Sequence, residues 1–163
     1  MTVSGIMDVT LRPFTHGDIR AWQRWKSAIN LDKFMSRSAP SRFEGTVDQE
    51  SSEYRWFVII VGNLDTGTIW LEREPGEWGV VRLGIFLGHE SSFGKGVGRR
   101  AIEQAICQAH AAFEFTRVRL AVRLNNDRAI ACYRACGFRE VGRGTKADIR
   151  NDAVDFMTME KEA

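Results

Sequence analysis

A strand, a glycine-rich loop and a helix follow one another within residues 80–113, and this succession constrains the fold most. Val80–Leu87 is a dense apolar run of the kind that forms a buried strand. Residues 94–98 then carry glycine at every second position. Residues 98–113 repeat apolar side chains at helical spacing. These apolar positions are Ala101, Ile102, Ala105, Ile106, Ala109 and Phe113.

The glycine-rich loop predicts a binding site for an anion. Glycine has no Cβ, so it lets the backbone turn sharply and approach a ligand closely. The N–H groups at the start of a helix lack partners within the helix, and the helix dipole attracts negative charge. Lys95, Arg99 and Arg100 add positive charge. We therefore expect a phosphate or pyrophosphate group to bind residues 94–99.

Two familiar phosphate-binding loops fit these residues less well. A Walker A loop ends in Gly-Lys-Ser/Thr, and no Ser or Thr follows a Gly-Lys pair here. A dinucleotide fingerprint needs Gly-x-Gly-x-x-Gly, whereas residues 94–98 read Gly-x-Gly-x-Gly. That fingerprint also needs an acidic residue at the end of the next strand, where residues 122–125 read Val-Arg-Leu-Asn. A Rossmann-type nucleotide-binding module is therefore kept as an alternative hypothesis.

Composition favours one cytoplasmic domain over residues 1–163. A chain of 163 residues with 44% hydrophobic and 27% charged residues can build a core without disulfides. A net charge of +2 gives no basic excess, so we expect no nucleic-acid partner. The first residues show no signal peptide, and the longest apolar run, 56–61, is too short to span a membrane. An odd number of cysteines, three, indicates free thiols in a reducing compartment.

No metal site is expected. Cys132 and Cys136 have a spacing that paired ligands use, but no second pair completes a zinc site. Small buried thiols explain them better.

The remaining pattern predicts an α/β (α+β) fold with a mixed sheet and helices. Short turns of Asn, Asp, Pro and Gly join three strands within residues 55–87, which is typical of an antiparallel meander. Strands are expected over 8–14, 55–61, 68–72, 80–87, 117–122, 138–142 and 153–160, and helices over 15–30, 46–53, 98–113 and 127–136.

A second motif spans residues 126–138. Asn126 is a suitable cap for the helix that follows, and Gly137 occupies the position of a glycine stop. Tyr133 lies seven residues after Asn126, two turns along the same helix face. Taken alone, Tyr133 fits an ordinary helix aromatic as well as a proton donor to a leaving thiolate.

With both motifs in order, the chain resembles the GNAT family, the Gcn5-related N-acetyltransferases. The family signature Q/R-x-x-G-x-G/A corresponds to the loop ending in Gly94, Gly96 and Gly98. The later element N-x-x-A-x-x-x-Y-x-x-x-G-F matches residues 126–138 without gaps. Phe93 stands where the wider family prefers Gln or Arg, as in the subgroup that holds ribosomal-protein N-terminal and spermidine acetyltransferases. The resemblance implies a mostly antiparallel sheet of six to seven strands, helices on both faces and a splayed central strand pair.

The resemblance also implies an acetyl-CoA site without a metal. The pantetheine arm is expected against the backbone of Ile85, Phe86 and Leu87, with Asn126 beside it. Tyr133 is expected near the thioester sulfur, as the general acid for the CoA thiolate. The pyrophosphate is expected on the loop residues Phe93, Gly94, Lys95, Gly96, Val97, Gly98 and Arg99.

The implied activity is transfer of an acetyl group from acetyl-CoA to a primary amine by direct attack. The acceptor is a small-molecule amine or a protein or peptide N-terminus, handled by a monomer or homodimer away from membranes. Residues 15–54 and 73–78 are expected to wall the acceptor site. The glutamate that often deprotonates the amine in this family is replaced, since the nearest positions hold Val81 and Arg82. The general base is unassigned, although several residues are candidates: Glu72, Glu74, Glu77, His89 and Glu90. A catalytically silent acyl-CoA sensor is the second alternative.

Overall fold

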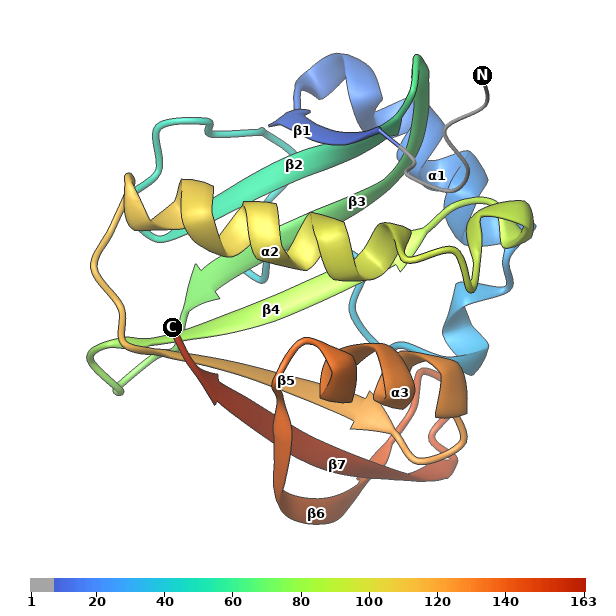
Figure 1. Ribbon diagram of the computed structural model, residues 1–163. Helices are drawn as coiled ribbons and strands as arrows, with labels where there is room; N and C mark the ends of the chain where they lie inside the picture. Colours follow the sequence, from blue (N-terminus) through green and yellow to red (C-terminus); the bar gives the residue numbers. More distant parts are fainter. Residues whose placement is uncertain (1–7) are drawn as a thin grey trace, which may run out of the picture.

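The computed structural model describes residues 8–163, which form one twisted sheet with helices on both faces (Figure 1). The sequence predicted that the first residues form no signal peptide, and most of these residues lie outside the described range. The strands are β1 (Val9–Pro13), β2 (Tyr54–Val61), β3 (Leu64–Arg73), β4 (Val80–Leu87), β5 (Arg117–Arg123), β6 (Arg139–Ala147) and β7 (Ala153–Glu162). The α-helices are α1 (Ile19–Ala28), α2 (Val97–His110) and α3 (Asp127–Ala135).

The sheet is mixed and mostly antiparallel, as the resemblance predicted. Its strand order is β1-β2-β3-β4-β5-β7-β6, and the β4–β5 pair is parallel whereas the other neighbours are antiparallel. A Rossmann-type module needs a mostly parallel sheet. The alternative of a nucleotide-binding module of that type is therefore wrong.

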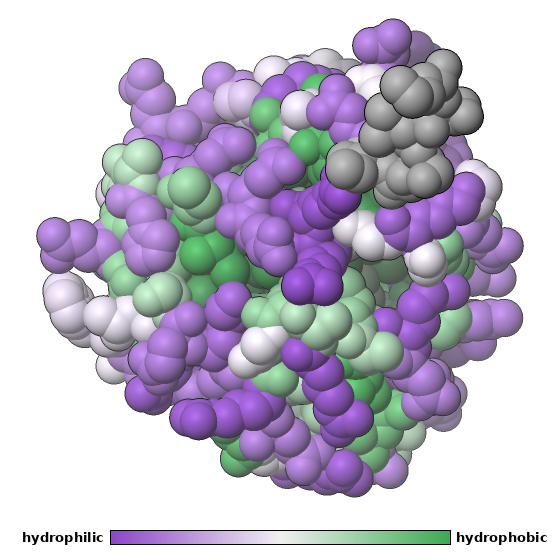
Figure 2. Space-filling view, viewed as in Figure 1, coloured by the Kyte–Doolittle hydropathy of each residue, from purple (hydrophilic) through white to green (hydrophobic). Residues whose placement is uncertain are grey.

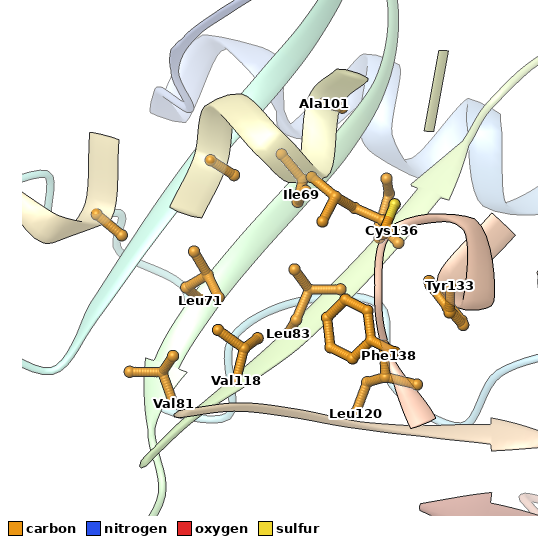
Figure 3. Packing of buried hydrophobic residues seen from close by; sticks show 14 of the residues in the cluster. Ile69, Leu71, Val81, Leu83, Ala101, Val118, Leu120, Tyr133, Cys136 and Phe138 are labelled. Atoms are coloured by element: carbon orange, nitrogen blue, oxygen red, sulfur yellow. The ribbon is translucent and has the colours of Figure 1, made fainter. Parts of the chain in front are cut away.

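Strand alternation produces two separate cores, one on each face of the sheet. Inward residues of β3, such as Ile69 and Leu71, pack with Ala101 of α2 and Tyr133 of α3, as Figure 3 shows. The intervening Trp70 packs on the opposite face against α1 and the segment that follows it. On the face that carries α2 and α3, many outer side chains are hydrophilic (Figure 2), because the apolar sides of these helices turn toward the sheet.

The predicted helix over 46–53 is wrong, because this segment forms turns and bends. Val47 and Gln49 instead pack near β1 and β2, and the hydroxyl of Tyr54 accepts a hydrogen bond from the N–H of Asp48 at 3.0 Å. The predicted strand over 138–142 is longer than expected and reaches Ala147. This strand pairs with β7 along its whole length although most of its side chains are exposed. Its hydrophobic pattern therefore predicted too short a strand.

The central strands β4 and β5 separate after a short paired stretch. Their ladder covers Val80–Arg82 on β4 and Arg117–Arg119 on β5. β4 stays paired to β3 up to Leu87, and β5 stays paired to β7 up to Arg123. The two strands therefore splay, as predicted, and each turns an unpaired edge toward the gap.

Candidate active site

A cavity of about 440 Å³ opens where β4 and β5 separate. It is bounded by the two strands, by α2 and α3 on one face, and by residues 29–35 on the other. The predicted site residues Ile85, Phe86 and Leu87 line it from β4. Backbone N–H and C=O groups on an unpaired strand edge need a partner, so this edge is suited to a ligand that carries amides.

The glycine-rich loop leads into a helix start whose backbone N–H groups lack partners within the helix. Gly94 and Gly96 have φ values of 72° and 78°, a backbone conformation that favours glycine. The first bond within α2 runs from the N–H of Arg100 to the carbonyl of Gly96, and no side chain caps the helix start. The N–H groups of residues 97–99 therefore lack helical partners, and these residues line the cavity. This arrangement suits an anion.

Lys95 is the one predicted site residue that does not line the cavity; its side chain is exposed. Arg99 lines it while its Nε lies 3.4 Å from Oε1 of Glu103, an exposed ion pair.

Phe93 lines the cavity with a cation on its ring. The guanidinium of Arg128 lies 3.7 Å from the ring centroid, and Arg128 also lines the cavity. Sequence reasoning missed Arg128, although it lies two residues after Asn126 in the second motif. An exposed arginine near a helix start looks like ordinary surface, and only the fold brings it to Phe93.

Asn126 and Tyr133 reach the cavity from the two ends of α3. The side-chain oxygen of Asn126 accepts a hydrogen bond from the N–H of Ala129 at 3.3 Å, so it caps the helix as predicted. Tyr133 is buried beside Phe138, with ring centroids 6.0 Å apart. Burial raises the pKa of the Tyr133 phenol above its ordinary value, and the neighbouring thiols raise it further. The phenol therefore keeps its proton at neutral pH, which a proton donor requires.

Cys132 is a second cavity residue that the sequence did not single out as a site residue. A hydrogen bond with Cys136 lowers the pKa of the Cys132 thiol. All three cysteines are free, and within residues 8–163 no group of three or more His, Cys, Asp or Glu side chains is arranged to hold a metal ion. No helix in the same range is long and apolar enough to cross a membrane.

The far side of the cavity is built by the segment after α1. Ile29, Leu31, Phe34 and Met35 line it there, so part of the expected acceptor wall, residues 15–54, does reach the site. Trp78, which ends the second segment expected in this wall, is largely exposed, at 78%.

The candidate bases are hydrogen-bonded, paired with cations or exposed. The Glu72 carboxylate is buried on β3 and accepts hydrogen bonds from the N–H and hydroxyl of Ser41 at 2.8 and 2.6 Å. Glu74 pairs with Arg82 at 2.8 Å. The Arg119 guanidinium lowers the pKa of Glu77. His89 and Glu90 are exposed.

A splayed β4–β5 pair beside a glycine-rich helix start is the arrangement expected of an N-acyltransferase that uses an acyl-CoA. A family profile described as an acetyltransferase (GNAT) domain matches residues 8–139. The chain therefore belongs to the GNAT family, which confirms the predicted enzyme class, an acetyl-CoA-dependent N-acetyltransferase. No curated protein matches the sequence.

Solved structures share the fold at low sequence identity. An aminoglycoside acetyltransferase AAC(6')-Ib in complex with coenzyme A is 19% identical, with a TM-score of 0.72 over 95% of both chains. RimJ of Mycobacterium smegmatis, in complex with CoA-disulfide, is 19% identical, with a TM-score of 0.76 over 95% of this chain and 82% of its own. Spermidine N-acetyltransferase of Vibrio cholerae, in complex with CoA and spermine, is 19% identical, with a TM-score of 0.74 over 94% and 95%.

Proposed function

We propose that the protein transfers an acetyl group from acetyl-CoA to a primary amine in a ternary complex, with Tyr133 as the general acid. One observation carries the proposal: a single cavity brings together an unpaired strand edge, free helix N–H groups and a buried neutral phenol. These are the groups that an amide-containing arm, a pyrophosphate and a leaving thiolate each need.

The loop and β4 are proposed to hold the co-substrate. The N–H groups of residues 97–99 donate to the pyrophosphate, and the α2 dipole favours its charge. The backbone of Ile85, Phe86 and Leu87 pairs with the pantetheine amides in place of the missing β5 ladder. Asn126 lies beside this arm, and Phe93 with Arg128 borders the loop end of the cavity.

The chemistry is direct attack by a neutral amine on the thioester carbonyl. A new C–N bond forms, the C–S bond breaks, and Tyr133 gives its proton to the departing thiolate. The N–H of Leu87 polarises the carbonyl oxygen, because Gly88 donates to Thr66 of β3 and alternation turns the Phe86 N–H toward β3 as well. The extra proton of the attacking amine leaves to water. Holding both reactants in line supplies much of the rate.

The protein is further proposed to act as one domain over residues 1–163, in the cytoplasm, as a monomer or homodimer. One continuous sheet and free thiols support this reading. The named neighbours act on an aminoglycoside or on spermidine, or carry the name RimJ, so a small-molecule amine or a protein N-terminus is the proposed acceptor class.

Thiol release from acetyl-CoA with a panel of primary amines tests the proposal. Tyr133→Phe should lower kcat by about 100-fold or more while CoA affinity stays unchanged, because only proton donation is removed. Tyr54→Phe is the matched control, since Tyr54 is the other tyrosine of the chain and binds Asp48 away from the cavity. Tight CoA binding without turnover on any amine would favour the silent acyl-CoA sensor instead.

A further inference from the structure

Several cations lie on the face of the sheet opposite α2, next to the splayed strands. On β4 and β5, Val81, Leu83, Val118 and Leu120 turn toward α2, so alternation turns Arg82, Arg119 and Arg123 the other way. On the neighbouring hairpin, Phe156 pairs with Arg123, and the ammonium of Lys146 lies 5.1 Å from the Phe156 ring centroid. Arg37 reaches the same face from the segment after α1, where it pairs with Glu72 at 3.3 Å.

Two of these cations lack a carboxylate partner. Arg82 pairs with Glu74, and Arg119 pairs with Glu77 and Glu160. Arg123 is only 5% exposed, yet within residues 8–163 it forms no ion pair. Its Nη1 donates to the carbonyl of Asp32 at 2.7 Å, its Nη2 donates to the hydroxyl of Ser36 at 3.1 Å, and its Nε has no partner there. Lys146 touches the ring of Phe156 and pairs with no acid in the described part of the chain.

A buried guanidinium without a counter-charge is costly, because one carbonyl and one hydroxyl replace only part of the hydration that it has lost. The positive charges are also close to one another. Burial lowers the pKa of the half-buried Lys146, and Arg123, Arg37 and Arg82 lower it further. The cations therefore repel one another. A bound anion would offset both this repulsion and the cost of burying Arg123 without a counter-charge.

The cluster lies on the acceptor side of the cavity. Arg123 donates hydrogen bonds to Asp32 and Ser36, and two of the three residues between them, Phe34 and Met35, line the cavity. Ala121, two residues before Arg123 on β5, lines it as well. Arg123 and Lys146 lie outside the lining. An acceptor in the gap therefore meets their charge with a part that extends past this wall.

We propose that Arg123 and Lys146 form a subsite for a carboxylate carried by the acceptor amine. The half-buried Lys146 ammonium offers donors to the carboxylate. Arg123, whose enclosed Nε has no partner, adds an unpaired positive charge beside it. This inference rests on the proposed acetyl transfer and narrows its acceptor to amino acids, peptides or other amines that bear a carboxylate. The carboxylate positions the acceptor and takes no part in the bond changes.

Anion binding is tested without turnover. The melting temperature is measured in sodium acetate, phosphate and chloride at equal ionic strength for wild type, Lys146→Gln and Arg143→Gln. Arg143 is the matched control, because it lies on the same strand as Lys146 but pairs with Met157 and faces the other side. Acetate should raise the melting temperature above the chloride value by about 3 °C in wild type and Arg143→Gln. Lys146→Gln should lose this gain.

Arg123→Gln should also lose the acetate gain in melting temperature. If Arg123→Gln fails to fold, the result for Lys146→Gln is the test of the subsite. An equal acetate gain in Lys146→Gln, or no gain in wild type, would overturn the subsite. A Lys146-dependent gain with phosphate but not acetate would overturn the assignment to carboxylate.

Acetyl transfer then tests the acceptor. Two matched pairs are compared, β-alanine with β-alaninamide and glycylglycine with glycylglycinamide. In wild type the carboxylate member should have a kcat/KM at least about tenfold higher, and the ratio should approach one in Lys146→Gln. A ratio near one in wild type would overturn the inference. An acetate gain without transfer to any amine would contradict the proposed function and leave the anion subsite standing.

Discussion

Gly96 and Gly98 belong to the same glycine-rich segment, yet they are glycines for different physical reasons. Gly96 has a φ of 78°, and a Cβ there would meet nothing within 4 Å. Only its backbone conformation requires glycine. Gly98 is already in α2, and a Cβ there would lie 3.3 Å from the Cys132 sulfur. Gly98 therefore lets α2 and α3 approach each other, which brings the helix start and Tyr133 to one cavity.

Replacing Gly96 with alanine should weaken both stability and cofactor binding. A non-glycine residue in the left-handed region costs about 1–2 kcal/mol, and relaxing that strain would rotate the N–H groups of the α2 start. Denaturant unfolding and calorimetry with CoA measure the two effects. Gly142→Ala is the control, because a Cβ there has open space and no positive φ. Unchanged CoA affinity in Gly96→Ala would contradict the role of this loop.

At the scale of elements, the sequence predicted the helices and strands that a pattern of neighbouring residues specifies. Strand β4, helix α2 and helix α3 follow from apolar periodicity, capping by Asn126 and the stop at Gly137, and their predicted bounds agree with the structure to within three residues. The segment between α1 and β2 has weak periodicity, so its path could not be predicted. It is held by contacts distant in sequence, such as Arg123 with Asp32 and Ser41 with Glu72. For the same reason the partners of Phe93 and Arg123 were not apparent from the sequence.

The entry to α1 is held by one buried carboxylate. Asp18 accepts two hydrogen bonds from Arg12, each 2.8 Å, and further bonds from the N–H and hydroxyl of Thr15. Burial alone would raise the pKa of Asp18, but Arg12 and Thr15 together lower it below the ordinary value of 3.8. Asp18 thus ties β1 to the helix that begins beside it.

Asp18→Asn should lower the free energy of unfolding by about 1–2 kcal/mol at neutral pH, since Arg12 is partly exposed and screened. The folded-state pKa of Asp18 is depressed, so its stabilisation is present above about pH 4 and lost as the pH falls through that lower pKa. The difference between wild type and variant should therefore shrink below pH 4, as measured by urea unfolding. Asp65→Asn, which removes a more exposed partner of Arg12, should cost less. An equal loss at all pH values would show that charge is not the cause.

At the scale of the whole molecule, the cavity is a consequence of topology. The splay leaves β4 and β5 each with one paired and one open edge, and α2, α3 and residues 29–35 close over the gap. No local pattern encodes where two strands part, so the resemblance to a family predicted this feature and periodicity did not. A ligand that fills the gap joins elements from both halves of the chain, and its binding should stabilise the fold as a unit.

Coenzyme A at 100 times its dissociation constant should therefore stabilise the protein by about 2.7 kcal/mol, which corresponds to a rise in melting temperature of roughly 5–10 °C. ADP carries the pyrophosphate without the pantetheine arm, so it should engage the α2 start but not the open edge of β4. Differential scanning fluorimetry with both ligands separates these contributions, and ADP should give the smaller shift at equal concentration. Equal shifts would mean that the arm gains nothing from the β4–β5 gap. The gap would then have no part in holding the thioester, and the proposed placement of Tyr133 beside it would lose its basis.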